Sequence, residues 1–451
     1  MIKKLLVANR GEIALRIIRA AQEMGIKTVA VYSKADAESL HRRYADESIC
    51  IGEAPASKSY LYYQNILGAA EASGADALHP GYGFLAENAD FAAACEALGI
   101  IFVGPSPESM EKMGGKAAAR KLMKESGIPV TPGSDGIIED LHEGQKIAEQ
   151  IGYPVMIKAA AGGGGKGMRI VNERRQLEKS LKNAAQEAEK AFGSSELYIE
   201  KYIPNARHIE VQILGDKYGN VVHLFERECS IQRSHQKLLE ESPSPALNKK
   251  VRNKICAAAV KAAKSVNYYS AGTIEFLFDV DTGKFYFMEM NTRIQVEHPI
   301  TEMVTNIDLV KKQLEVANGD ELCLSQRDIS HYGHAIECRI NAEDWENGFS
   351  ACPGKINHYI VPGGLGVRVD SACYQGWEIL PYYDSLIAKL ISWGKDRKEA
   401  IARMRRALDE FIIDGVPTTI PFHKKLLQEP EFIKANITTN FIEKYLTNPK
   451  E

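Results

Sequence analysis

The sequence predicts an α/β and α+β multidomain protein that begins with a doubly wound parallel sheet. Its 451 residues suffice for three domains, at roughly 150 residues per domain. In the N-terminal part, short apolar runs alternate with helical patterns, whereas the last part combines several short strands with a late helix. The first arrangement is typical of α/β domains and the second of α+β domains.

Alternating strands and helices predict the N-terminal parallel sheet. The expected strands are 4–8, 28–32, 48–51, 75–79 and 100–103. Apolar residues at helical spacing, with Gly25 at the end, indicate a helix between the first two strands. The turn after the first strand lacks the Gly-x-Gly-x-x-Gly fingerprint, so a nicotinamide cofactor is not indicated. The turn at 79–85 follows a strand end, where ligands of such sheets bind, but a tight turn without a ligand fits equally well.

A glycine-rich loop marks the central part of the chain. A strand over 153–158 ends in Lys158 and continues into a run of four glycines followed by Lys166 and Gly167. Such a loop offers many free N–H groups and is suited to covering phosphates, although it is not a Walker loop. A flexible linker is the weaker alternative, because residues 168–171 form the expected hairpin partner of that strand. The other elements expected nearby are helices over 107–127 and 174–192 and a strand over 197–202.

Two later helices are also expected. An Ala-rich helix spans about 249–266. The second begins near Asp396, which has capping-box spacing to Glu399. Its core-facing residues are Ile401, Met404, Leu408 and Phe411.

A row of polar residues follows the apolar strand 285–290. From Glu289 to Glu297 every second residue is polar, and residues two apart in an extended chain share a side. Burying this row without partners would be costly, so we expect it to face a cation, an anion or both. The alternative is an exposed edge, but the strand is too apolar for that and Pro299 ends it. The members of the row are Glu289, Asn291, Arg293, Gln295 and Glu297.

Glu275 adds a second carboxylate to this row. Its strand is expected to pair with the strand that contains Glu289 and Asn291. Two carboxylates and an amide are hard oxygen ligands that suit magnesium held together with nucleotide phosphates. Positive charge for those phosphates would come from the glycine loop, Lys116 and Lys158.

Composition and charge exclude several classes of protein. Lys and Arg number 56, Asp and Glu number 59, and the net charge is −3, so we expect no bulk attraction to nucleic acid or membrane. The apolar run at the start is too short for a signal peptide, and no run reaches the roughly 18 residues of a membrane span. The eight scattered cysteines indicate reduced thiols rather than a zinc site or disulfides. A cytoplasmic enzyme is therefore expected.

Six motifs carry a resemblance to a known family. They are Ala-Asn-Arg-Gly-Glu-Ile (8–13), His-Pro-Gly-Tyr-Gly-Phe-Leu-Ala-Glu-Asn (79–88), Lys-Ala-Ala-Ala-Gly-Gly-Gly-Gly-Lys-Gly (158–167), Glu-Arg-Glu-Cys-Ser-Ile-Gln-Arg-Ser-His-Gln-Lys (226–237), Glu-Met-Asn-Thr-Arg-Ile-Gln-Val-Glu-His-Pro (289–299) and Glu-Cys-Arg-Ile-Asn-Ala-Glu-Asp (337–344). From Lys4 to about residue 446, the chain resembles the biotin carboxylases of the ATP-grasp superfamily. So many long motifs in order make a chance match very improbable.

The resemblance implies a domain organisation and an activity. The expected domains are a biotin carboxylase N-terminal (Rossmann-like) domain over 1–114, an ATP-grasp domain over 115–330 with a mobile lid at about 131–203, and a biotin carboxylase C-terminal domain over 331–447. The implied activity is ATP-dependent carboxylation of biotin by bicarbonate through carboxyphosphate, with Mg²⁺ or Mn²⁺. It would be the first half-reaction of acetyl-CoA carboxylase in fatty acid synthesis or of a related carboxylase, and the final carboxyl acceptor stays open.

Partners are implied as well. The biotin would be carried on a separate biotin carboxyl carrier protein, because the chain contains no Ala-Met-Lys-Met biotinylation motif. Carboxyltransferase subunits and a second copy of the chain, forming a homodimer, are the other expected partners.

Individual residues receive roles by the same resemblance. ATP would be bound by Lys116, Lys158, Gly164, Gly165, Glu200, Lys201, Ile203, His208, Gln232 and His235. The metal, and with it the nucleotide, would be held by Glu275, Glu289 and Asn291. Bicarbonate would be held by Lys237, Arg293, Gln295 and Val296, of which Lys237 and Arg293 also count as catalytic. Glu297 matches the catalytic base, Arg339 the residue that faces the biotin ureido group, and Tyr82 and Gly83 the turn beside the biotin pocket.

Departures from the family pattern are few, and two alternatives stay open. Gly115, Glu228 and Ser234 replace more usual residues, and the lost charge at Ser234 is expected to weaken anion binding. One alternative is another ATP-grasp ligase that joins a carboxylate to an amine, against which the row and Arg339 argue. The other is a nucleotide-binding subunit without turnover, against which the intact Lys237, Arg293 and Glu297 argue.

Overall fold

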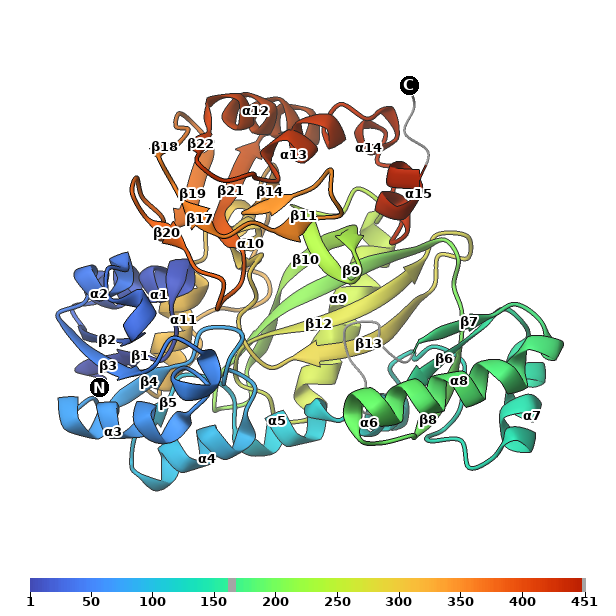
Figure 1. The fold of residues 1–451 in the computed structure, drawn as a ribbon. Coiled ribbons are helices and arrows are strands. Elements are labelled where there is room, and N and C mark those ends of the chain that lie inside the picture. Colours follow the sequence, from blue (N-terminus) through green and yellow to red (C-terminus); the bar gives the residue numbers. More distant parts are fainter. Residues whose placement is uncertain (161–167, 448–451) are drawn as a thin grey trace.

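The structure is a computed structural model that describes residues 1–160 and 168–447 (Figure 1). It contains a parallel sheet near the N-terminus, a small three-stranded sheet and a large antiparallel sheet. The predicted multidomain α/β and α+β fold is confirmed. No helix in the described ranges combines the length and the apolarity needed to cross a membrane.

The N-terminal sheet is parallel and has helices on both faces. Its strand order is β3-β2-β1-β4-β5, the doubly wound arrangement that the sequence predicts. Leu5 and Val7 of β1 pack with α1 on one face, whereas Leu6 packs on the other face with residues of α3 and α4. The elements are β1 (Lys4–Val7), α1 (Gly11–Glu23), β2 (Lys27–Ser33), α2 (Leu40–Tyr44), β3 (Glu47–Gly52), α3 (Tyr63–Ser73), β4 (Ala77–His79), α4 (Ala89–Ala97) and β5 (Ile101–Phe102).

The single helix expected over 107–127 is wrong. The structure has two helices, α5 (Pro107–Gly114) and α6 (Lys116–Glu125), because the backbone at Gly115 is extended, with φ −86° and ψ 108°. Glycine breaks helices readily because its backbone loses more conformational freedom in a helix than that of any other residue. The break places Lys116 at the first position of α6.

A small separate sheet corresponds to the predicted lid. Its order is β7-β6-β8, and β6 pairs antiparallel with β7, as the hairpin prediction required. The apolar side of β6 packs against α8 through Leu177 and Leu181. The glycine run with Gly164 and Gly165 lies outside the described residues. The elements are α7 (Leu141–Ile151), β6 (Val155–Ala159), β7 (Arg169–Val171), α8 (Arg174–Phe192) and β8 (Leu197–Lys201).

An eight-stranded antiparallel sheet joins the central and C-terminal parts of the chain. Its order is β13-β12-β9-β10-β11-β14-β21-β19, so the β11–β14 pair crosses the domain boundary expected at 330. Helix α9 packs against the central strands and α12 against the C-terminal ones (Figure 1). The strands are β9 (Ala206–Gly215), β10 (Val221–Arg233), β11 (Gln236–Ser242), β12 (Ser270–Asp279), β13 (Phe285–Asn291), β14 (His334–Asn341), β19 (Val367–Ser371) and β21 (Leu386–Gly394).

The remaining elements support this sheet. The predicted capping box is confirmed, since Asp396 accepts the Glu399 N–H at 2.8 Å at the start of α12. The helices are α9 (Lys249–Ser265), α10 (His298–Thr305), α11 (Leu309–Ala317), α12 (Arg397–Glu410), α13 (Ile420–Leu426), α14 (Pro430–Ile433) and α15 (Phe441–Thr447). The short strands are β15 (Glu343–Asp344), β16 (Ser350–Ala351), β17 (Gly354–Lys355), β18 (His358–Ile360), β20 (Glu378–Ile379) and β22 (Ile412–Asp414).

A buried carboxylate, Glu241 of β11, joins three elements. It accepts hydrogen bonds from His334 of β14 at 2.7 Å and from Arg397 of α12 at 2.6 Å. Burial by itself would raise the pKa of Glu241, but the charge of Arg397 and the bond to His334 lower it to about 2. A carboxyl group whose pKa falls on folding stabilises the folded state above its ordinary pKa of 4.5 and loses that contribution as the pH falls.

We expect Glu241→Gln to lower the apparent midpoint of thermal unfolding most near neutral pH. The difference from the unsubstituted protein should shrink as the pH falls from about 4.5 toward about 2, because the unfolded chain then binds a proton at Glu241 that the folded protein does not bind. Thermal unfolding followed by fluorescence at a series of pH values measures it. Glu53→Gln, in an exposed pair with Lys34, is the control and should change little. A difference for Glu241→Gln that does not vary with pH would contradict the prediction.

Candidate active site

The polar row that follows β13 is not fully extended. Strand β13 ends at Asn291, and the chain then turns before α10 begins at His298. The turn nevertheless keeps the side chains together, since Arg293 donates to Asn291 at 3.0 Å and Gln295 donates to Glu275 at 2.9 Å. The predicted grouping of these residues is therefore confirmed, whereas the extended geometry is wrong.

A lysine whose side chain is only 12% exposed lies at the centre of the site. The Nζ atom of Lys237 is 2.5 Å from Glu210, 3.0 Å from Glu275 and 2.7 Å from Glu297. Burial by itself would lower the pKa of Lys237, but the three carboxylates raise it well above its ordinary value. Lys237 is therefore a fixed positive charge in this structure, held by residues of β9, β12 and the turn before α10.

Glu297 connects Lys237 with Arg339. One carboxylate oxygen of Glu297 binds Lys237 and the other lies 2.9 Å from an Arg339 nitrogen. Although burial acts to raise it, the pKa of Glu297 is lowered by Lys237, Arg339 and Arg227. Arg339 also donates to the buried Glu240 at 2.7 Å, and burial raises the pKa of Glu240 to about 7. The expected base and the expected biotin-facing arginine are thus in direct contact.

The expected metal ligands lie on one face of two paired strands. Glu275 of β12 is directly opposite Glu289 of β13, and Asn291 donates to Glu275 at 2.9 Å. Directly opposed residues in an antiparallel pair share a face, so these oxygen-bearing groups fit a divalent cation in chemistry and placement. Glu289 itself pairs with Lys116 at 3.1 Å.

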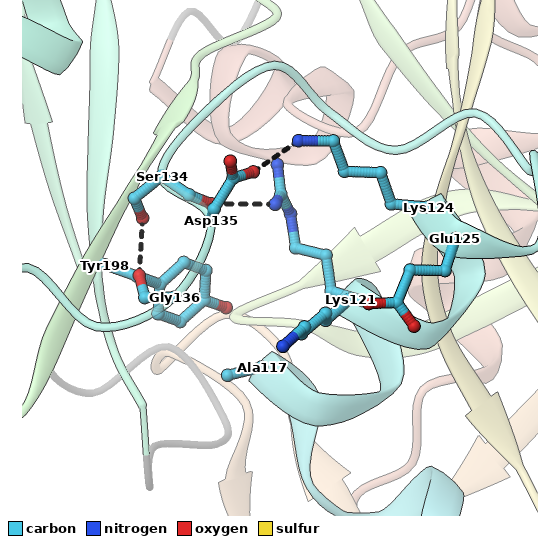
Figure 2. A pocket seen from close by; sticks show the side chains of 9 residues that line it. Ala117, Lys121, Lys124, Glu125, Ser134, Asp135, Gly136 and Tyr198 are labelled. Atoms are coloured by element: carbon cyan, nitrogen blue, oxygen red, sulfur yellow. Dashed lines mark hydrogen bonds and ion pairs between the residues drawn. The ribbon is translucent and has the colours of Figure 1, made fainter.

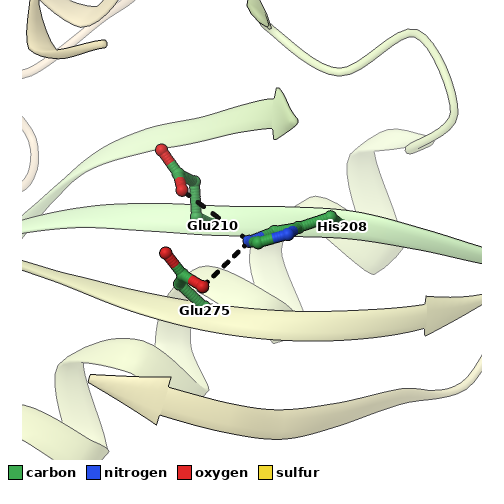
Figure 3. Close-up of side chains that lie close together, drawn as sticks. All are labelled: His208, Glu210 and Glu275. Carbon is green, nitrogen blue, oxygen red and sulfur yellow. Dashed lines mark ion pairs between the residues drawn. The ribbon is translucent and has the colours of Figure 1, made fainter. Parts of the chain in front are cut away.

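His208 and Glu210 approach the same carboxylate from β9. Figure 3 shows His208 pointing toward Glu275, with a separation of 3.0 Å between His208 Nε2 and the carboxylate. Burial acts to lower the pKa of His208, but the charge of Glu275 raises it. His208 and Glu210 are two residues apart on one strand and therefore share its face. Their strand thus completes a dense polar cluster around Glu275.

The expected nucleotide residues in the described ranges come from the lid, from α6 and from the part of the large sheet that contains β9 and β10. Lys158 of β6 binds Glu200 of β8 at 2.6 Å, and Glu200 also accepts from Arg120 at 3.1 Å. Lys201 instead donates to the carbonyls of residues 152 and 153 at 3.0 and 2.9 Å, so its ammonium group fixes a turn of the lid. The other expected residues in the described ranges are the buried Ile203 and Gln232 and the exposed His235.

A cavity lies beside these lid residues. Its volume is about 460 Å³, and Figure 2 shows the ion pair of Lys124 with Asp135 at its rim. Members of the polar row are not among its described lining residues, which are Ala117, Arg120, Lys121, Lys124, Glu125, Ser134, Asp135, Gly136 and Tyr198. The cavity therefore adjoins the nucleotide residues through Arg120 but is separate from the row.

The turn that carries Tyr82 is shaped by a glycine and an asparagine. Asn9 donates to the carbonyls of Pro80 and Tyr82 at 2.7 and 2.8 Å. Gly81 has φ +64°, and a Cβ atom there would lie 2.9 Å from the Asn9 side chain, so only glycine fits. Gly83 also has a positive φ. The Tyr82 hydroxyl donates to Glu12 of α1.

Sequence reasoning assigned no role to two residues that organise the site. Arg227 is completely buried and donates to Glu210, to Gln295 at 2.8 Å and to three further side chains. Glu87 accepts from Arg293 and from the Thr292 N–H, both at 3.0 Å. Both lie within the recognised motifs (226–237 and 79–88), but a motif alone does not show which partners its residues meet.

Family models cover nearly the whole chain. "Biotin carboxylase, N-terminal domain" matches residues 1–110, "Carbamoyl-phosphate synthase L chain, ATP binding domain" matches 115–325, and "Biotin carboxylase C-terminal domain" matches 337–444. Biotin carboxylase 1 of Bacillus subtilis is 59% identical over 445 residues, which cover 99% of each chain. The chain belongs to the biotin carboxylase family.

Solved structures of family members agree with this assignment. A biotin carboxylase complex from Campylobacter jejuni has a TM-score of 0.95 at 51% identity, over 98% of this chain and 99% of that one. The biotin carboxylase domain dimer of 2-oxoglutarate carboxylase from Hydrogenobacter thermophilus, solved with MgADP, ADP and bicarbonate, has a TM-score of 0.94 at 51% identity over the full length of both chains. Neither alternative function is favoured by these biotin carboxylase relatives.

We expect Arg227→Met to destabilise the protein by about 3 to 5 kcal/mol, because Glu210 and the Gln295 carbonyl lose a buried cationic partner. The readout is the apparent midpoint of unfolding in urea. Arg169→Met, which removes an arginine from the exposed pair with Glu187, is the matched control and should cost less than about 1 kcal/mol. Equal midpoints for the two variants would contradict the prediction.

Proposed function

We propose that this protein carboxylates biotin that is carried on a separate carrier protein, using bicarbonate and ATP and releasing ADP and phosphate. The observation that carries the proposal is the contact of Glu297 with both Lys237 and Arg339. A base that touches the cation expected at bicarbonate and the cation expected at biotin is suited to a reaction between those two substrates. Another ATP-grasp ligase would not require this pair of contacts.

The first step activates bicarbonate. Bicarbonate is a poor electrophile because its charge is delocalised, and transfer of the γ-phosphoryl group of ATP to one of its oxygens gives carboxyphosphate and ADP. We assign Lys237, Arg293, Gln295 and Val296 to bicarbonate and Glu297 to its proton. Lys237, Arg339 and Arg227 lower the pKa of Glu297. A bound anion that attracts Lys237 and Arg339 would raise that pKa and make Glu297 a stronger base.

The nucleotide would bind between α6 and the lid. We assign Lys116, Lys158, Glu200, Lys201, Ile203, His208, Gln232 and His235 to it, together with Gly164 and Gly165 outside the described residues. Glu275, Glu289 and Asn291 would hold Mg²⁺ or Mn²⁺, which would offset the negative charge of the phosphates. The Hydrogenobacter thermophilus relative was solved with MgADP and bicarbonate, which supports binding of a magnesium nucleotide and of bicarbonate.

The second step transfers the carboxyl group to biotin. The ureido nitrogen of biotin attacks the carboxyl carbon of carboxyphosphate, the bond from that carbon to the phosphate oxygen breaks, and the leaving phosphate takes up the ureido proton. Arg339 would stabilise the negative charge that develops on the ureido oxygen, since a guanidinium group stays protonated under physiological conditions. Tyr82 and Gly83 would border the biotin ring.

The domain organisation and partners extend the proposal. We infer domains over 1–114, 115–330 with a lid at 131–203, and 331–447, which the three family-model ranges support. The relatives include a biotin carboxylase subunit of pyruvate carboxylase, so a biotin carboxyl carrier protein and carboxyltransferase subunits are the proposed partners. The dimer named for the Hydrogenobacter thermophilus relative supports a homodimer. The cytoplasmic location stays a prediction.

We expect phosphate release to require ATP, magnesium and bicarbonate and to rise when free biotin is added. A coupled phosphate assay with each component omitted in turn measures this. Stimulation by biotin separates carboxylation from simple ATP hydrolysis, and the omission of bicarbonate controls for contaminating ATPases. Phosphate release that does not respond to biotin would refute the proposed function.

We expect Arg339→Ala to lower the biotin-dependent rate by about a hundredfold or more, because the developing ureido oxyanion loses its cation. ATP affinity should change by less than about threefold, since the described side-chain partners of Arg339 are Glu240 and Glu297 and not the nucleotide residues in the described ranges. Phosphate release and nucleotide titration provide the two measurements. Arg339→Lys, which keeps the charge, should recover part of the rate. Equal losses in turnover and in ATP binding would contradict this role.

A further inference from the structure

A completely buried lysine, Lys389, has no role in the reaction described so far. It lies on β21, directly opposite Arg339 of β14, and its side chain is 0% exposed. Its Nζ atom lies 3.0 Å from Glu12 Oε2 and donates to the Val296 carbonyl at 3.0 Å. Because a buried ammonium group is costly without partners, these contacts fix its position.

Both partners of Lys389 lead to expected substrate residues. Glu12 accepts the hydroxyl of Tyr82, whose ring centre is 5.9 Å from Lys389 Nζ. Val296 directly precedes Glu297, the expected base. A continuous series of contacts therefore runs from Tyr82 through Glu12 and Lys389 to the backbone beside Glu297.

Two other acids near Lys389 do not replace Glu12. Asp370 is 4.0 Å from Nζ and already accepts two hydrogen bonds from Arg368, at 2.8 and 2.7 Å. Glu337 is buried without a hydrogen-bond partner on either carboxylate oxygen, and burial raises its pKa well above the ordinary value. Among the described residues, Glu12 is the acid closest to Lys389 Nζ, at 3.0 Å against 4.0 Å for Asp370.

We propose that Lys389 is a positioning residue that holds the biotin-side turn at Tyr82 and the bicarbonate-side turn at Val296 in one fixed arrangement. The inference rests on the proposed function for its kinetic consequences. Carboxyl transfer requires the two substrates to meet in a narrow range of geometries. The two turns belong to different parts of the chain, and Lys389 comes from a third, so its ammonium group joins all three where the substrates would meet.

The test uses a charge-balanced double variant, Glu12→Gln/Lys389→Met. Lys389→Met alone would leave Glu12 buried without its cation and is expected to unfold at lower temperature. In the double variant both charges are gone, and the glutamine carbonyl still accepts the Tyr82 hydroxyl. The Val296 carbonyl, however, has lost its charged donor. Glu241→Gln/Arg397→Met is the matched control, since it removes an ion pair between β11 of the same sheet and α12, and neither residue has a described contact with the row.

We expect the double variant to raise the KM for bicarbonate at least about tenfold, the usual effect of losing a charge-assisted hydrogen bond. Its KM for ATP should stay within about twofold of the starting value, because the nucleotide residues are not part of this series of contacts. The control pair should leave both KM values unchanged. A folded double variant with an unchanged KM for bicarbonate, or with both KM values raised equally, would overturn the proposal.

A second measurement does not depend on turnover. Amide hydrogen exchange in the ligand-free protein should become faster across residues 292–298 in the double variant and stay unchanged in the lid strands. Unchanged exchange at 292–298 would overturn the positioning role. If the unsubstituted protein showed no biotin-dependent turnover, the proposed function alone would fail, and the exchange experiment would still decide whether Lys389 holds this turn.

Discussion

The ammonium group of Lys237, buried among three carboxylates, is the interaction on which the site depends. Removing one lysine and three glutamates from water is costly unless their charges meet at hydrogen-bond distance. The lysine comes from β11 and its partners Glu210, Glu275 and Glu297 come from β9, β12 and the turn before α10. The register of the large sheet therefore has to be correct before these charges can be buried, which couples folding to the construction of the site.

Neighbouring residues complete the charge balance around this cluster. Arg227 donates to the carboxylate oxygen of Glu210 that Lys237 does not bind, and it orients the side-chain amide of Gln295. Arg339 donates to the second carboxylate oxygen of Glu297. The other acid that Arg339 contacts is Glu240, and burial raises the pKa of Glu240 to about 7. Positive charge is thus concentrated where two anionic reactants would bind, and each of these cations has a carboxylate partner within the protein. A bound anionic substrate would replace a carboxylate as the partner of these cations, so it would not enter a site whose positive charges are unpaired.

The N-terminal part of the chain contacts the site through the loop that carries Glu87 and through the first turn of α1. Glu87 binds the backbone and the arginine of the polar row, and Glu12 meets both Tyr82 and Lys389. These contacts use the carboxyl ends of parallel strands, the edge at which such sheets present ligand-binding residues. The turn at 79–85, which as sequence was equally compatible with a turn without function, is therefore part of the site's framework.

Local structure could be predicted from the sequence where one physical signal dominated. Apolar periodicity placed the strands of the parallel sheet, and the capping box located the start of α12. Two predictions failed, one for a local reason and one because of a distant contact. The helix expected over 107–127 breaks at Gly115. The row bends after Asn291, where Glu87 accepts hydrogen bonds from the Thr292 N–H and from the Arg293 side chain. That second cause is a contact across some two hundred residues, and no local pattern reveals it.

The sequence by itself determined the family, the order of the elements and the set of polar residues that belong to the site. Only the tertiary structure decided which charges meet. Strand β10 carries irregularities in its register with both neighbours, so alternation along it does not show where the Arg227 side chain points. Lys389 lies in an apolar strand far from the motifs, and its role follows only from the docking of α1 and the Val296 turn against it. Periodicity assigns a residue to a face, whereas an ion pair between distant residues depends on register and domain packing together.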